Sequence, residues 1–192
     1  MSYQLGYSDV LKALFSPSDP VGFLIIIGVF AGIPLLNIYL LKRAGKLRRS
    51  WRVLLVIAGI LIAVILVPNW NMAGAGWQLT DGEFKLRAWP VAATLDVSAV
   101  RVALVENSGP WRPTVRTNGY GTPGLTTGWC RLANGKKAVV FRHLRSEKMV
   151  VIETGGRYYI ISHPGVEKLY DALIAQGAAQ WAIDTGERKG DV

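Results

Sequence analysis

The chain has 192 residues, a formal net charge of +9 and a hydrophobic fraction of 51%. This composition excludes a disordered polar chain, which needs low hydrophobicity and high charge. A single cysteine, Cys130, excludes a disulfide-stabilised scaffold. Six basic and no acidic residues lie in the stretch 42–52, between two apolar segments. Because a nucleic-acid binder carries its basic residues across a folded domain, we expect no nucleic-acid partner.

The first 20 residues predict a short interfacial helix. Ser8 and Asp9 favour a helix start, and the apolar residues that follow fall on one side of the helix. Two X-Pro pairs, Ser16-Pro17 and Asp19-Pro20, then end it. We expect this segment, residues 1–20, to precede a membrane anchor.

Two apolar segments, 21–41 and 53–67, predict a transmembrane helical hairpin over residues 21–70. The first segment has no charged residue, and as a helix it reaches across a hydrocarbon core of about 30 Å. Trp51 and Trp70 bracket the second segment as interfacial anchors. The hairpin predicts a multi-pass protein of the bacterial inner membrane. Neither segment contains Asp, Glu, Lys, Arg or His, which argues against a transporter or channel.

The loop between these segments is predicted to set the orientation of the protein in the membrane. Its basic residues are Lys42, Arg43, Lys46, Arg48, Arg49 and Arg52. Short loops rich in Lys and Arg stay cytoplasmic, so we expect the domain after residue 70 to be extracytoplasmic. The alternative use of these residues is contact with anionic lipid headgroups. Gly28 and Gly32 are expected to pack the two helices together, or alternatively to support a homo-oligomer.

Residues 71–181 predict a second unit made of short antiparallel strands and one helix. Asp81-Gly82, Asn134-Gly135 and Gly155-Gly156 each lie between two alternating apolar stretches, which is typical of two-residue hairpin turns. From Pro164 onward, Val166, Leu169, Tyr170, Leu173 and Ile174 recur with helical period. The pattern predicts a bent antiparallel barrel of seven or eight strands that is closed by this helix. Residues 182–192 are expected to form a flexible tail.

This order of elements resembles the pleckstrin-homology-like (PH-like) fold. The stretches that are similar to the bacterial PH domain family are 116–119 (RTNG), 122–124 (TPG), 128–132 (GWCRL), 134–140 (NGKKAVV), 150–154 (VVIET) and 158–162 (YYIIS). The resemblance covers residues 76–176. It implies an α+β membrane protein in which the hairpin precedes a seven-stranded antiparallel PH-like barrel with a C-terminal helix. It also implies a binding or assembly role without shared catalytic residues.

Motifs that could carry chemistry have simpler structural interpretations. The stretch 119–124 matches G-x-G-x-x-G, but a strand and not a helix follows it, so we expect close backbone approach there instead of nucleotide binding. The adjacent Ser162 and His163 point to opposite faces of a strand and cannot form a catalytic dyad. His143, His163 and Cys130 do not have metal-site spacing. We therefore predict no catalytic residue, no cofactor and no metal.

These observations predict a non-enzymatic, membrane-anchored binding module that acts as an accessory or assembly subunit of a larger membrane protein complex. Its expected partners are other integral membrane proteins. Arg142, Arg145 and Lys148 are expected to form a solvated loop surface, or alternatively to contact a partner. Contact with anionic lipids there would make the protein a lipid-surface sensor, which is the alternative function. A less favoured alternative is a membrane-bound hydrolase. The acidic turn at residues 80–83 does not support phosphoinositide binding.

Overall fold

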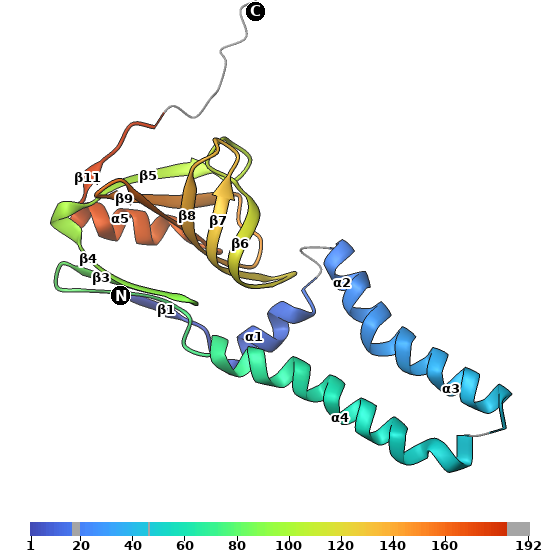
Figure 1. Ribbon diagram of the computed structural model, residues 1–192. Helices are drawn as coiled ribbons and strands as arrows, with labels where there is room; N and C mark the ends of the chain where they lie inside the picture. The colour runs from blue at the N-terminus through green and yellow to red at the C-terminus, as the bar shows by residue number, and fades with distance from the viewer. Residues whose placement is uncertain (17–19, 46, 184–192) are drawn as a thin grey trace, which may run out of the picture.

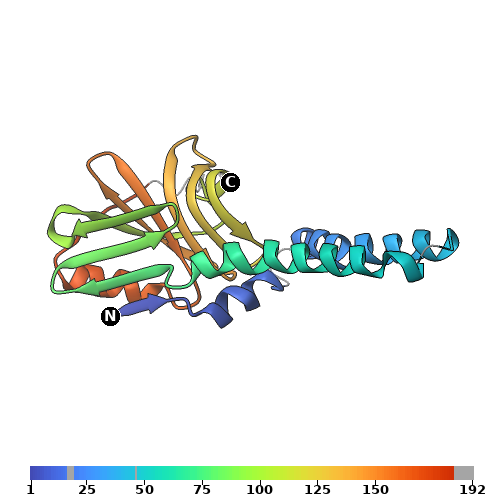
Figure 2. The ribbon, with the colours of Figure 1, turned by 60° about the horizontal axis from the view of Figure 1, so that its bottom comes forward.

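The computed structural model describes residues 1–16, 20–45 and 47–183. Two β-sheets and a helix form a barrel-like body. A helical arm, made of residues 20–45 and 47–72, projects from it (Figures 1 and 2). The helical segments are α1 (Tyr7–Leu14), α2 (Pro20–Ile27), the π-helical η1 (Gly28–Gly32), α3 (Ile33–Arg43), α4 (Leu47–Met72), the 3₁₀ turn η2 (Val97–Ala99) and α5 (Glu167–Ala175). The strands are β1 (Ser2–Gln4), β2 (Gly76–Thr80), β3 (Glu83–Ala88), β4 (Val91–Asp96), β5 (Arg101–Glu106), β6 (Pro113–Thr122), β7 (Leu125–Leu132), β8 (Lys137–His143), β9 (Lys148–Thr154), β10 (Arg157–Ser162) and β11 (Ala179–Gln180).

The predicted transmembrane hairpin is wrong. Among the residues that the structure describes, no helix combines the length and the apolar character that crossing a membrane requires. The first apolar segment is divided into α2 with 8 residues, η1 with 5 and α3 with 11. Pro34, at the start of α3, has no N–H to donate, and the backbone changes to π-helical hydrogen bonding just before it. The predictions of a multi-pass inner-membrane protein and of an extracytoplasmic barrel depended on this hairpin and are wrong with it.

Sheet topology also differs from the predicted barrel of seven antiparallel strands. The first sheet has four antiparallel strands in the order β1-β2-β3-β4, and the second has seven in the order β11-β5-β9-β10-β8-β7-β6. Within the second sheet, β8 pairs with β10 in parallel, and so does β11 with β5. The three predicted hairpin turns are confirmed, since they join β2 to β3, β7 to β8 and β9 to β10.

The N-terminal segment is built into the body of the protein. β1 pairs with β2 at the edge of the first sheet, and the amino group of Met1 donates to the Leu79 carbonyl at 2.7 Å. α1 then packs against α4 and β7 (Figure 2). Its apolar side, with Val10, Ala13 and Leu14, is buried in the protein. This segment therefore links the first sheet to the start of the arm.

Helix α5 closes the barrel, as the helical period of its sequence predicted. It begins at Glu167, three residues after Pro164, and packs against β5 and β9. Val166, Leu169 and Leu173 are fully buried in the main hydrophobic core between the two sheets. The stability of the barrel therefore depends on this apolar face.

Replacing Leu169 by alanine should lower the free energy of unfolding by about 3 kcal/mol, because it leaves a cavity in the core. Urea unfolding monitored by circular dichroism measures this loss. The matched control is Lys168→Ala, at the adjacent exposed position, which should change stability by less than about 0.5 kcal/mol. Equal losses for the two variants would contradict the role assigned to α5.

Candidate functional site

The helical arm exposes apolar side chains along most of its length. Leu36 in α3 is 57% exposed, and Val56 in α4 is 61% exposed. The other large exposed apolar residues of the arm are Val21, Leu24, Ile25, Ile27, Val29, Ile33, Leu35, Ile38, Tyr39, Leu40, Leu55, Ile60, Val67 and Trp70. Folded proteins rarely leave so continuous an apolar surface uncovered unless it binds something. The arm is therefore a candidate interaction element.

The root of the arm is fixed to the barrel by several contacts. Tyr120 in β6 donates its hydroxyl hydrogen to the side chain of Asn69 at 2.5 Å, and burial raises the pKa of Tyr120 to about 12. The rings of Tyr7 and Trp70 lie 5.6 Å apart, so α1 also supports the end of α4. Met72 is buried in the main core. These contacts set the direction in which the arm leaves the barrel.

Two of the six basic residues predicted to set topology are fully described, and they lie at the end of α3. Lys42 and Arg43 end α3 and are exposed. Lys46 lies outside the described residues, as do the side chains of Arg48, Arg49 and Arg52, whose backbone belongs to α4. Gly28 and Gly32 were predicted to pack the two helices of the hairpin together. A Cβ built at either glycine meets no described atom within 4 Å, so these positions do not pack against the described part of α4.

Arg142, Arg145 and Lys148 are not gathered into one continuous positive surface. The Arg142 guanidinium donates to Thr126 Oγ1 at 3.1 Å, and Lys148 Nζ lies 4.0 Å from a carboxylate oxygen of Glu167. Arg145 lies at a hollow of about 210 Å³ that Glu106 and Glu147 also line. Acidic side chains thus accompany two of the three basic ones. The prediction that this group contacts a partner or a lipid surface stays a prediction.

A buried cluster joins the two histidines to the N-terminal strand. The Tyr3 hydroxyl lies 2.6 Å from His143 Nδ1, and the Tyr3 ring stacks on His163 with a centroid separation of 3.9 Å. Trp77 Nε1–H donates to His163 Nε2 at 3.0 Å, so Nδ1 of that ring carries the proton and donates to the Pro164 carbonyl. Burial is the main cause that lowers the pKa of both histidines.

The hydrolase alternative would use Ser162 or Cys130, and neither side chain forms a hydrogen bond with a histidine among the described residues. Ser162 Oγ donates to the Lys148 carbonyl at 3.4 Å. Cys130 belongs to a separate core cluster, where burial raises the pKa of its thiol. No group of three or more His, Cys, Asp or Glu in the described part of the chain could hold a metal ion.

The G-x-G-x-x-G stretch serves close backbone approach, as predicted. Gly119 in β6 has a φ of +132°, and a Cβ built there would lie 2.1 Å from the Thr127 carbonyl oxygen of β7. Gly124, in the turn between these strands, donates its N–H to the Ala13 carbonyl at 2.8 Å. The turn thus contacts α1. The glycines join three elements and do not form a phosphate-binding loop before a helix.

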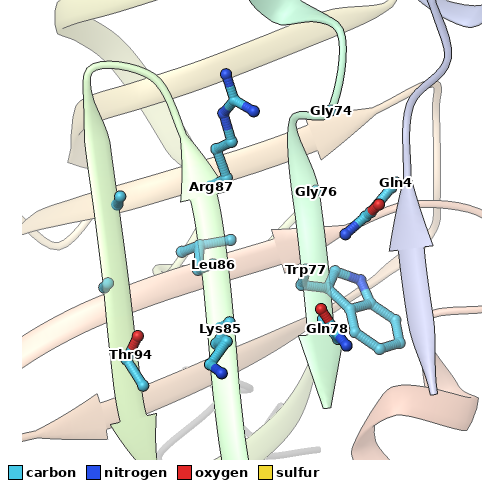
Figure 3. A pocket seen from close by; sticks show the side chains of 11 residues that line it. Gln4, Gly74, Gly76, Trp77, Gln78, Lys85, Leu86, Arg87 and Thr94 are labelled. Carbon is cyan, nitrogen blue, oxygen red and sulfur yellow. The ribbon is translucent and has the colours of Figure 1, made fainter. Parts of the chain in front are cut away.

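A hollow of about 390 Å³ lies on the outer face of the first sheet (Figure 3). Its polar side chains come from all four strands, and they are Gln4, Gln78, Lys85, Arg87 and Thr94. This site was not predicted from the sequence, because its residues come from four strands that no common motif links. The alternation of exposed and buried residues in β3 was the one available signal, since it places Lys85 and Arg87 on the same face.

The fold and the arm together have the form of a binding module: a barrel-like body of two sheets and a helix holds an apolar helical arm in a set direction. The bacterial PH domain family matches residues 75–176, and the chain belongs to this family. The match confirms the resemblance that the sequence motifs indicated. Domains of this family are typically non-catalytic. Neither the curated proteins nor the solved structures contain a match to the chain.

Proposed function

We propose that the protein is a non-enzymatic binding module that acts as an accessory or assembly subunit of a larger protein complex, and that its arm is the element its partner covers. The observation that carries this proposal is the continuous exposure of apolar side chains along α2, α3 and α4. A helix that is apolar on all sides is normally buried, and the barrel does not bury this one.

The partner we propose is a protein that presents apolar helices. Branched and long aliphatic side chains on paired helices form ridges and grooves into which another helix packs. The contacts at the root of the arm support this function as well, because Asn69, Trp70 and Met72 hold α4 against the barrel. A partner bound along the arm would therefore also be placed relative to the barrel.

Site-specific photo-crosslinking in the cells that produce the protein tests this function. A benzophenone amino acid at Leu36 or Val56 should yield adducts with the same partner protein, with the cross-links mapped to an apolar helix of that partner. The matched control is Val115, an equally exposed apolar residue on β6, which should yield none of this adduct. Adducts with lipid alone, or equal adducts from Val115, would overturn the proposal.

A further inference from the structure

The hollow on the first sheet is formed by the register of its strands. One row across the sheet places Gln78 opposite Lys85, and Lys85 opposite Thr94. The next row places Gly76 opposite Arg87, and Arg87 opposite Ala92. Glycine and alanine therefore flank Arg87 on both sides, and their small size leaves the space that Figure 3 shows.

Gly76 cannot carry a side chain in this row. Its φ is +145°, and a Cβ built there would lie 2.0 Å from the Tyr3 carbonyl oxygen. The close approach of β1 that this glycine permits also brings Gln4 to the hollow, since Gln4 pairs with Gly76. Gly76 therefore leaves its place in the row beside Arg87 without a side chain, and it lets β1 bring the Gln4 amide to the hollow.

The charges at the hollow favour an anion. Arg87 is exposed, and none of the ion pairs between described residues involves it. Lys85 lies 3.1 Å from Glu83, but both side chains are more than half exposed, and such a pair contributes little and exchanges readily with solvent. The remaining polar groups are the amides of Gln4 and Gln78 and the hydroxyl of Thr94. Gln78 Nε2 donates one hydrogen to Thr80 Oγ1 at 3.2 Å, which leaves its second N–H, like the other two groups, able to donate.

We propose that this hollow is a binding site for a phosphate group, with the Arg87 guanidinium as its main ligand. Lys85 lies two residues away on the same face, about 7 Å along the strand. Long basic side chains at this spacing can both reach one phosphate, and the amides of Gln4 and Gln78 can donate to its other oxygens. This site is separate from the arm, so it goes beyond the function proposed above.

Calorimetric titration of the full chain with inorganic phosphate tests the site. We expect saturable binding with a dissociation constant on the order of 1 mM, which is typical of an open site with few contacts. Arg87→Gln should weaken it about tenfold, the loss expected for one charge-assisted interaction. The matched control is Arg131→Gln, which removes the same charge from an exposed position on β7 and should leave binding unchanged.

A second variant fills the hollow without changing its charge. Ala92→Leu, at an exposed position opposite Arg87, should abolish phosphate binding and leave the circular dichroism spectrum unchanged. Vesicles of phosphatidylcholine with and without phosphatidic acid show whether a lipid headgroup supplies the phosphate. Binding that needs phosphatidic acid and Arg87 assigns a lipid source, whereas binding of inorganic phosphate alone assigns a free one. No binding of either, or equal loss in Arg131→Gln, would overturn the proposal.

Discussion

Acidification from about pH 8 to about pH 5 should lower the free energy of unfolding of the barrel. His143 and His163 are 7% and 3% exposed, and burial lowers the pKa of both in the folded chain. The unfolded chain protonates its histidines near pH 6.5. Their contribution to stability is therefore fully present above about pH 6.5 and is lost as the pH falls. Each can lose at most about 1.4 kcal/mol per pH unit.

The groups around the two rings modify this loss but do not reverse its direction. Asp9 favours protonation of His143, whereas His163 opposes it. For His163, its hydrogen bond to the Pro164 carbonyl and the charge of Glu167 favour the protonated form. Burial is nevertheless the largest influence on both. Protonated His163 would also place an N–H at Nε2 against the donor of Trp77, which removes that hydrogen bond.

The double variant His143→Gln with His163→Gln should flatten the stability profile between pH 5 and pH 6.5, because glutamine can hydrogen-bond but does not titrate in this range. Urea unfolding at several pH values gives the profile. Glu153→Gln serves as the control, since Arg101 lowers the pKa of Glu153 and its effect belongs below about pH 4.5. The crosslinks from Leu36 and Val56 should survive in the double variant. An unchanged acid slope would contradict the assignment to the histidines.

Elements with local signals were predictable from the sequence. Asp81-Gly82 predicted the β2–β3 hairpin because both residues accept the positive φ that such a turn needs, and their φ values are 48° and 80°. Helix α5 was predictable because its buried residues repeat every three or four positions. In both cases the residues that determine the element lie within or beside it.

Elements that depend on distant partners were not predictable. β1 has only three residues, and it is held by pairing with β2, more than 70 residues away. The parallel pairing of β8 with β10 follows from the chain passing through β9 between them, which hairpin signals do not specify. The apolar segments correctly indicated helices, but the sequence pattern did not show the π-helical break that precedes Pro34.

The candidate sites divide in the same way, into those with a local sequence signal and those that depend on residues far apart in the chain. The exposed apolar arm could be anticipated from the apolar segments, although the two membrane-spanning helices inferred from them were wrong. The histidine cluster could not, because Tyr3 and His143 are 140 positions apart in the sequence. The hollow around Arg87 could be predicted only with the strand register known, because the register makes Gly76 and Ala92 the neighbours of Arg87.

The pairing of β6 with β7 requires glycine at two facing positions. Gly128 in β7 lies opposite Gly119, and its φ is +104°. A Cβ built at Gly128 would lie 2.4 Å from the Asn118 carbonyl oxygen and 3.0 Å from that of Trp89. Backbone atoms of β6 and of the β3–β4 turn therefore fill the space that a side chain would need.

Gly128→Ala should therefore lower the free energy of unfolding by at least about 3 kcal/mol, from backbone strain and overpacking together. Gly135→Ala separates these causes, because Gly135 also has a positive φ of +81° but a Cβ built there meets nothing within 4 Å. This control should lose only the conformational part, about 1 kcal/mol. Urea unfolding of both variants gives the two values. Equal losses would show that conformation alone, and not the close approach of β6 to β7, requires glycine at position 128.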